Sequence, residues 1–132
     1  MIDTSQRQEL KDYLCDSIRL IPTAQFKVIG NVGADGEVLG VVGYDNFTRR
    51  MCEMHIAGET GWLTRKMIWS MFHYPFIYCN LSIVMSKVSS ANTKSLEVVR
   101  RLGAQLECTI KDGCEDGDMC LFSLRKENCR WI

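Results

Sequence analysis

The sequence lacks a run of about 20 apolar residues, because charged or polar side chains interrupt every hydrophobic stretch, and we expect no membrane span. Its first residues, MIDTSQRQELKDYL, lack the basic segment and apolar core of a signal peptide, which favours a cytoplasmic protein. It also lacks net charge, with 16 Lys plus Arg against 16 Asp plus Glu. Nucleic-acid and membrane-surface binders need a basic excess, so we expect neither partner.

Metal-binding patterns are missing as well. The seven cysteines include no pair separated by two to four residues, the spacing that is typical of zinc sites. His55 and His73 complete no known ligand pattern. We therefore expect no metal, and we expect thiols that stay reduced in the cytoplasm.

Internal repeats, low-complexity segments and linkers are absent too, and what is present is typical of a single globular domain spanning residues 1–132. Hydrophobic residues make up 46% of the 132 residues and charged residues 24%. A chain of this length buries roughly two thirds of its unfolded surface, so it needs neither disulfides nor a metal to fold.

The apolar periodicity predicts a mixed α/β order. Helices are expected at 4–20, 62–74 and 92–102, and strands at 25–32, 38–47, 51–57, 81–88, 105–111 and 119–125. The Gly-Ala-Asp-Gly segment at 33–36 predicts a hairpin, and Gly103 is typical of a residue that ends a helix. The strand at 81–88 is apolar on both faces, which indicates a buried strand that lies parallel to an earlier one after a crossover helix.

This order, together with Asn92-x-x-Ser95, LEVVRRLG at 96–103 and the closing hairpin, resembles the GNAT superfamily of acyl-CoA-dependent N-acyltransferases. The segments MHIAGETGW, FHYPF and LRKENCRW resemble, more narrowly, small GNAT-type proteins of tailed bacteriophages and prophages. The likeness extends from about Val38 to the end of the chain.

The resemblance implies a mixed, mostly antiparallel central sheet of about five or six strands, with a parallel pair at the cofactor cleft and about three flanking helices. A helix and hairpin would occupy 1–50, a cofactor-binding strand-loop-helix-strand-helix core 51–103, and a closing hairpin and tail 104–132.

The resemblance also implies acetyl-CoA as co-substrate, with its pyrophosphate at a helix amino terminus, where free N–H groups bind anions. The residues matched to cofactor binding are Ile56, Ala57, Gly58, Gly61, Trp62, Leu63, Thr64, Arg65, Asn92 and Ser95. The family pattern Q/R-x-x-G-x-G/A is altered here, because Trp62 and Thr64 stand at its small positions. The alternatives are a plain strand-to-helix connector for the glycine loop, and a helix cap for Asn92.

Two titratable residues of the strand at 51–57 are candidates for a catalytic base. Alternation places Glu53, His55 and Ala57 on one face and Met54 and Ile56 on the other. N-acylation needs a neutral amine, so a base must take a proton directly or through water.

Each candidate base also has a structural alternative. Glu53 is either that base or the partner of Arg49 or Arg50 in an ion pair, and His55 is either a base or a half-buried structural histidine. The resemblance implies that a backbone N–H near Ile56 polarises the thioester carbonyl.

The tyrosine that many GNAT enzymes use to protonate the departing thiolate is replaced here by Val99, which leaves Tyr44, Tyr74 and Tyr78 as substitutes. Two hypotheses follow. The first is an acetyl-CoA-dependent N-acetyltransferase acting on an amine of a protein or small molecule, including a host target, in the host cytoplasm, if the protein is phage-encoded. The second is a catalytically weak or inactive GNAT-fold phage protein that binds and modulates a host protein. A monomer and a homodimer are equally compatible with both.

Overall fold

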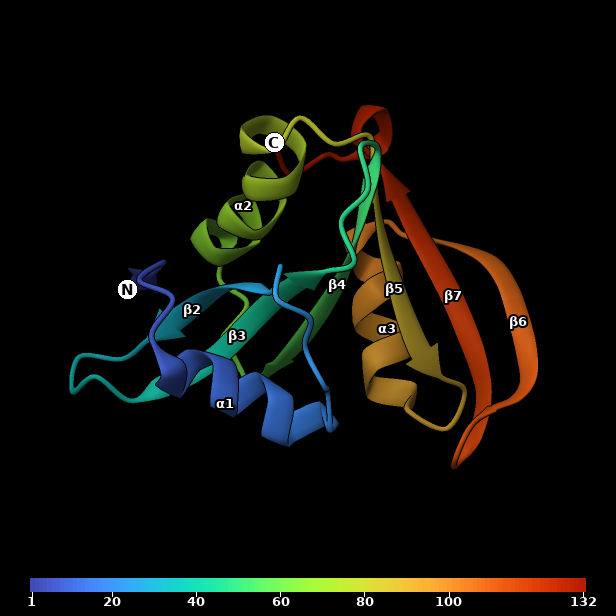
Figure 1. The fold of residues 1–132 in the computed structure, drawn as a ribbon, viewed down its shortest axis with the longest axis horizontal. Helices are drawn as coiled ribbons and strands as arrows, with labels where there is room; N and C mark the ends of the chain where they lie inside the picture. Colours follow the sequence, from blue (N-terminus) through green and yellow to red (C-terminus); the bar gives the residue numbers. More distant parts are fainter.

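The computed structural model describes residues 1–132, which form a mixed arrangement of strands and helices (Figure 1). Its elements, in chain order, are β1 (Ile2–Asp3), α1 (Gln8–Ile18), β2 (Lys27–Val32), β3 (Val38–Asp45), β4 (Met51–Gly58), α2 (Arg65–His73), the π-helical turn η1 (Tyr74–Tyr78), β5 (Ile83–Ser89), α3 (Thr93–Leu102), β6 (Gln105–Cys114), β7 (Gly117–Arg125) and the 3-10 turn η2 (Lys126–Asn128). No helix combines the length and the apolar character that crossing a membrane would require.

All the strands form one sheet in the order β1-β2-β3-β4-β5-β7-β6. Every neighbouring pair is antiparallel except β4 and β5, which are parallel. The predicted mixed, mostly antiparallel sheet with one parallel pair and three helices is thus confirmed. The seventh strand, β1, is a two-residue segment paired with Gly30 and Asn31, too short to leave a pattern in the sequence.

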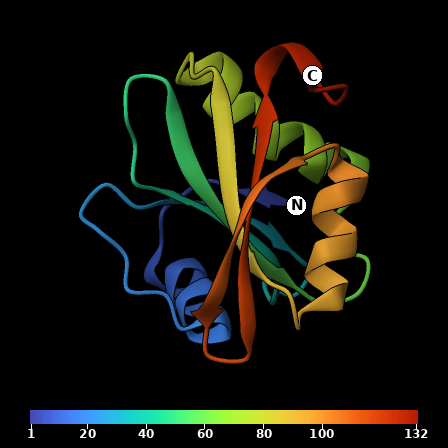
Figure 2. The ribbon, with the colours of Figure 1, turned by 90° about the vertical axis from the view of Figure 1, so that its right-hand side faces the viewer.

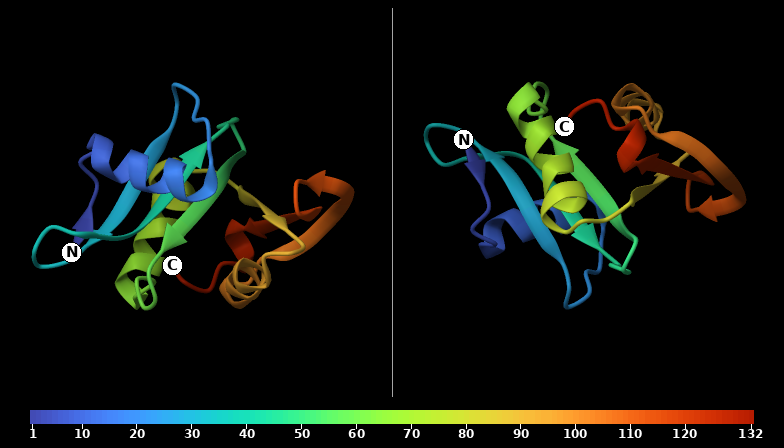
Figure 3. Two further views of the ribbon diagram at one scale, coloured as in Figure 1. Left: turned by 90° about the horizontal axis from the view of Figure 1, so that it is seen from below. Right: turned by 90° about the horizontal axis from the view of Figure 1, so that it is seen from above.

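The helices cover opposite faces of the sheet (Figure 3). Helix α1 packs its apolar side against β2 and β3, where Leu10 and Leu14 meet Val28 and Val41. Helices α2 and α3 lie on the other face, α2 over β2–β4 and α3 over β5 and β7. Figure 2 shows α3 beside the twisted ribbon of β5, β7 and β6.

Two helices begin later than the sequence predicts. Helix α1 starts at Gln8, because the Gln6 side chain is used to pair with the β2 edge: its amide donates to the Val28 carbonyl at 2.7 Å and accepts from the Val28 N–H at 2.9 Å. Helix α2 starts at Arg65, because Thr64 caps it through its Oγ1, which accepts from the Met67 N–H at 3.1 Å.

Strand β5 is parallel to β4, as predicted, but it is buried on one face only. Val84 and Val88 face the α2–α3 layer and are buried, whereas Lys87 on the opposite face is exposed. The expectation of burial on both faces was therefore wrong: α1 packs on β2–β4, so it covers only the first half of that face.

Candidate functional site

Strands β4 and β5 pair at one end and separate at the other. Their parallel register joins Met51 to Ile83, Cys52 to Val84 and Glu53 to Met85 and then ends, although β4 continues to Gly58 and β5 to Ser89. The last link is the Ser86 hydroxyl, which donates to the Met54 carbonyl at 2.9 Å. Figure 1 shows the two strands diverging beyond this point.

The backbone of β4 in this gap has no strand partner on the β5 side. Backbone groups alternate along a strand, and the Arg50 and Met54 carbonyls both accept from the segment at 82–86, so even-numbered residues face β5. On the other side, Glu59 N–H donates to Leu39 O of β3 at 2.8 Å, as expected for odd-numbered residues. The N–H of Ile56 therefore points into the gap.

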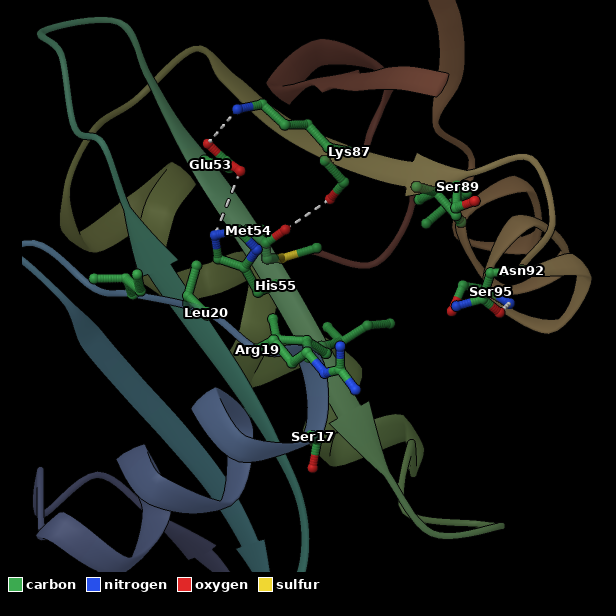
Figure 4. Close-up of a pocket in the computed structure, with 16 residues that line it drawn as sticks. Ser17, Arg19, Leu20, Glu53, Met54, His55, Lys87, Ser89, Asn92 and Ser95 are labelled. Carbon is green, nitrogen blue, oxygen red and sulfur yellow. Dashed lines mark hydrogen bonds and ion pairs between the residues drawn. The ribbon is translucent and has the colours of Figure 1, made fainter. Parts of the chain in front are cut away.

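A cavity of about 560 Å³ occupies the separation (Figure 4). Its lining comes from the end of α1 and the segment after it, from β4, from β5 and from the start of α3: Ser17, Ile18, Arg19, Leu20, Ile21, Glu53, Met54, His55, Ile56, Ser86, Lys87, Val88, Ser89, Asn92, Ser95 and Val99. Because α1 and α3 lie on opposite faces of the sheet, the cavity is lined by residues from both faces.

Glu53 is a buried carboxylate at the point where the strands part, with 5% of its surface exposed. The Asn46 amide donates to Oε2 at 2.9 Å, and Lys87 Nζ lies 3.5 Å from the same oxygen. On the other side, Oε1 lies 3.5 Å from His55 Nε2. The partners of Glu53 are thus Asn46, Lys87 and His55; neither Arg49 nor Arg50 forms the ion pair that the sequence suggested.

His55 is largely buried, and its Nε2 makes no hydrogen bond. Burial lowers the pKa of its imidazole, while the nearby carboxylates of Glu53 and Asp45 act in the opposite direction and Lys87 lowers it further. The net direction is downward, so the ring is neutral near pH 7. The predicted division of faces is confirmed: Met54 and Ile56 pack toward α2, and Ala57 packs toward α1.

The loop after β4 lies outside the cavity. None of the predicted cofactor residues from Ala57 to Arg65 lines it. Trp62 is part of the core with only 7% of its surface exposed, and a Cβ added at Gly40 or Gly58 would lie within 2.5 Å of its ring. The Trp62 side chain therefore packs in the core and not toward the cavity.

The remaining groups of this loop form a helix amino terminus. Gly61 has φ of 85°, a conformation that favours glycine. The N–H groups of Trp62, Thr64 and Met67 are used inside the loop and cap. Arg65 and Lys66 are exposed in the first turn of α2 and supply positive charge beside its free N–H groups.

Asn92 and Ser95 line the α3 side of the cavity, and Asn92 also caps the helix by accepting from the Ser95 N–H at 3.1 Å. Val99 lines the cavity one turn later, and no tyrosine lines it. Tyr44 is buried and donates its hydroxyl to the Met71 carbonyl at 2.6 Å, while Tyr74 and Tyr78 line other cavities on the α2 side. The fold does not bring any of the three substitutes to the site.

Sequence reasoning missed two contributors to the cavity, the 17–21 segment and Lys87. The segment overhangs β4 because Arg19 adopts a left-handed conformation at the end of α1, and because the buried Asp45 carboxylate accepts from the N–H of Thr23 at 2.7 Å and from its hydroxyl. No local pattern predicts this tether. For Lys87 there was a signal, because it is the only charged residue in the strand at 81–88.

No group of three or more His, Cys, Asp or Glu side chains is arranged to hold a metal ion. No protein-family model matches the sequence, and no curated protein matches it.

Solved acetyltransferase structures do match the fold. A chimera of the Vibrio cholerae spermidine N-acetyltransferase SpeG with hSSAT superposes with a TM-score of 0.76 at 14% identity, over 96% of this chain and 96% of that one. The Campylobacter jejuni N-acetyltransferase PseH in complex with acetyl coenzyme A gives 0.62 at 16% identity over 79% and 70%. A GNAT-family acetyltransferase from Bacillus anthracis gives 0.64 at 14% identity over 76% and 66%. The chain has the fold of the GNAT acetyltransferases.

Proposed function

We propose that the protein is an N-acetyltransferase that transfers the acetyl group of acetyl-CoA to an amine of a protein or small molecule. The observation that carries the proposal is the gap between β4 and β5, where an unpaired backbone N–H and a buried carboxylate lie along one cavity. The shared fold with PseH, whose structure contains acetyl coenzyme A, supports it.

The residues on the α2–α3 side fit a CoA molecule. The unpaired edge of β4 offers backbone donors and acceptors to an amide-containing chain, as a further strand would. The amino terminus of α2, with Arg65 and Lys66, offers N–H groups and positive charge to phosphates. Asn92 and Ser95 border the same cavity from α3. When bound there, acetyl-CoA supplies a thioester whose carbonyl carbon accepts the amine.

The residues on the α1 side accept the proton of the amine, and the backbone beside them stabilises the negative charge that develops on the carbonyl oxygen. Glu53 takes a proton from the amine, directly or through water, and neutral His55 beside it is the second acceptor. The Ile56 N–H, already pointing into the gap, donates to the carbonyl oxygen as its negative charge grows. Because no tyrosine lines the cavity, water protonates the departing thiolate.

A second function is favoured by the same absence of a tyrosine and by the N–H groups of Trp62, Thr64 and Met67, which are already used inside the loop and cap. It is a GNAT-fold binding protein with weak or no catalysis that modulates a host protein. The resemblance of three segments to phage-encoded proteins supports a host partner for either function, as a target of acetylation or as a binding partner, in the host cytoplasm.

Titration calorimetry with acetyl-CoA, followed by measurement of CoA thiol release with a panel of primary amines, tests the proposal. We expect saturable binding and amine-dependent release. No heat and no thermal shift at millimolar acetyl-CoA or CoA would overturn the enzyme and leave the binding protein. Binding without release for any amine would favour the weakly catalytic alternative.

A further inference from the structure

Lys87 is the only one of the seven lysines that lines the cavity, and it does so next to the proposed base. Its ammonium nitrogen lies 3.5 Å from Glu53 Oε2, and 42% of its side chain is exposed. Figure 4 shows the side chain reaching from β5 across the separation toward Glu53. A primary amine of this chain thus stands beside the carboxylate that the proposed reaction needs.

We propose that Lys87 is an acceptor within its own chain, so that the protein acetylates itself at this position. The inference rests on the proposed function. Lys87 belongs to the strand that borders the gap, on the α1 side, and its aliphatic stem is flexible. The ion pair with Glu53 is long, at 3.5 Å, and transfer requires the half-exposed side chain to turn along the cavity toward the Ile56 N–H.

The step is an acyl transfer that balances without any reagent besides acetyl-CoA. The ammonium group of Lys87 gives one proton to Glu53, which passes it to solvent. The neutral amine forms a bond from Nζ to the thioester carbonyl carbon, the carbon–sulfur bond breaks, and its electron pair stays with sulfur. The second proton from nitrogen ends on sulfur, so the products are acetyl-Lys87, CoA thiol and one released proton.

Acetylation would also change the site. It removes the only lysine charge within 4 Å of Glu53, while the Asn46 hydrogen bond and the His55 contact remain. The carboxylate then faces a neutral amide, and the cavity loses the amine that competes with an external acceptor. We therefore expect the modified protein to bind cationic amines differently from the unmodified one.

Intact mass spectrometry and peptide mapping of the full chain after incubation with acetyl-CoA test the proposal. We expect one added acetyl group, mapped to Lys87, at a rate that saturates with acetyl-CoA and does not depend on protein concentration. Lys87→Arg should abolish the adduct, and Lys111→Arg, at an exposed position of β6, should leave it unchanged. Glu53→Gln should slow it by roughly 100-fold or more. Because the mapping uses the unaltered chain, it does not depend on the folding of any variant.

A second measurement involves no turnover. Labelling of lysines by N-hydroxysuccinimidyl acetate, with and without saturating CoA, should show Lys87 protected several-fold and Lys111 unaffected. Unchanged labelling of Lys87 would overturn the inference, because the amine would not share the CoA cavity. If acetyl-CoA binds in calorimetry but no acetyl adduct forms, or if adducts are spread over exposed lysines, self-acetylation at Lys87 is overturned and the proposed function is not. Absence of binding would overturn the proposed function with it.

Discussion

The two ends of β4 have the same alternating backbone but differ in their strand neighbours. From Met51 to Glu53 the strand pairs with β5 and buries Cys52 completely, and Glu53 is paired with β3 as well. From Met54 to Gly58 it pairs only with β3, and the edge that faces β5 is open to a cavity. Loss of one neighbouring strand thus leaves the backbone edge of β4 open along a cavity.

Glu53 stands at the junction between these two ends. It is the last residue of the paired segment, so its carboxylate is held by the fold, yet its side chain lines the cavity. The Asp45 tether from β3 brings the 17–21 segment over the same point. The fold thus places a buried carboxylate at the residue after which the β4 edge loses its β5 partner.

The largest effect is expected for Trp62→Ala, because this side chain fills the space over Gly40 and Gly58 at the far end of the open segment. Truncating a buried tryptophan commonly costs about 3–5 kcal/mol of the free energy of unfolding. Denaturant titration should show this loss, whereas Trp69→Ala, at a half-exposed position stacked on His73, should cost about 1 kcal/mol or less. A stable Trp62→Ala protein that has lost only acetyl-CoA binding would contradict the structural role.

Next in size is the effect of Glu53→Gln on acetyl transfer, at the junction. We expect a loss of roughly 100-fold or more in rate if Glu53 is the base, the scale that general base catalysis commonly contributes. His55→Gln should produce that loss instead if the imidazole carries the role. Glu127→Gln, at an exposed position of η2, is the control and should keep the full rate. Full rates in both site variants would show that neither group is the base.

A smaller effect is expected beyond the open end, at the start of α2. Arg65→Ala should weaken acetyl-CoA binding by about 1 kcal/mol, the scale of a partly exposed charge-assisted contact, and added salt should weaken it further. Arg49→Ala changes an equally exposed arginine at the opposite end of β4 and should leave the calorimetric affinity unchanged. Equal losses in the two variants would indicate a general charge effect and no local phosphate site.

The smallest effect concerns the pH dependence of folding stability. The pKa of His55 is lowered in the folded state, mainly by burial, so between its folded and unfolded pKa values the unfolded chain binds more protons. Its contribution therefore destabilises the fold as pH falls below about 6.5 and vanishes above it. Between pH 7.5 and 5 the wild type should lose more free energy of unfolding than His55→Gln. Parallel stability curves for the two proteins would contradict a buried neutral imidazole.

The elements of the fold were largely predictable because each leaves a local pattern. The hairpin at 33–36, the parallel strand at 81–88 and the Gly103 helix end all occur as expected. The predicted start of the second helix, at Trp62, was three residues too early. Trp62 fits the amphipathic pattern of that helix, but its side chain packs over Gly40 and Gly58, which lie far apart in the sequence.

The site was only partly predictable, for a similar reason. Strand alternation brings Glu53 and His55 to one face, and the helix start brings Asn92 and Ser95 to the cavity. The 17–21 segment and Lys87 reach it through a tether to Asp45 and through the parallel placement of β5, which are long-range contacts. No spacing in the chain encodes them.

Amide hydrogen exchange with and without saturating acetyl-CoA tests the central claim most directly, because it compares the two ends of β4 in one experiment. Without ligand, the N–H groups of Ile56 and Gly58 should exchange faster than that of Cys52, which lies in the paired segment. Acetyl-CoA should slow exchange at Ile56 and Gly58 and leave Cys52 unchanged. Saturable binding that protects neither Ile56 nor Gly58 would contradict the assignment of the cofactor to the gap between β4 and β5.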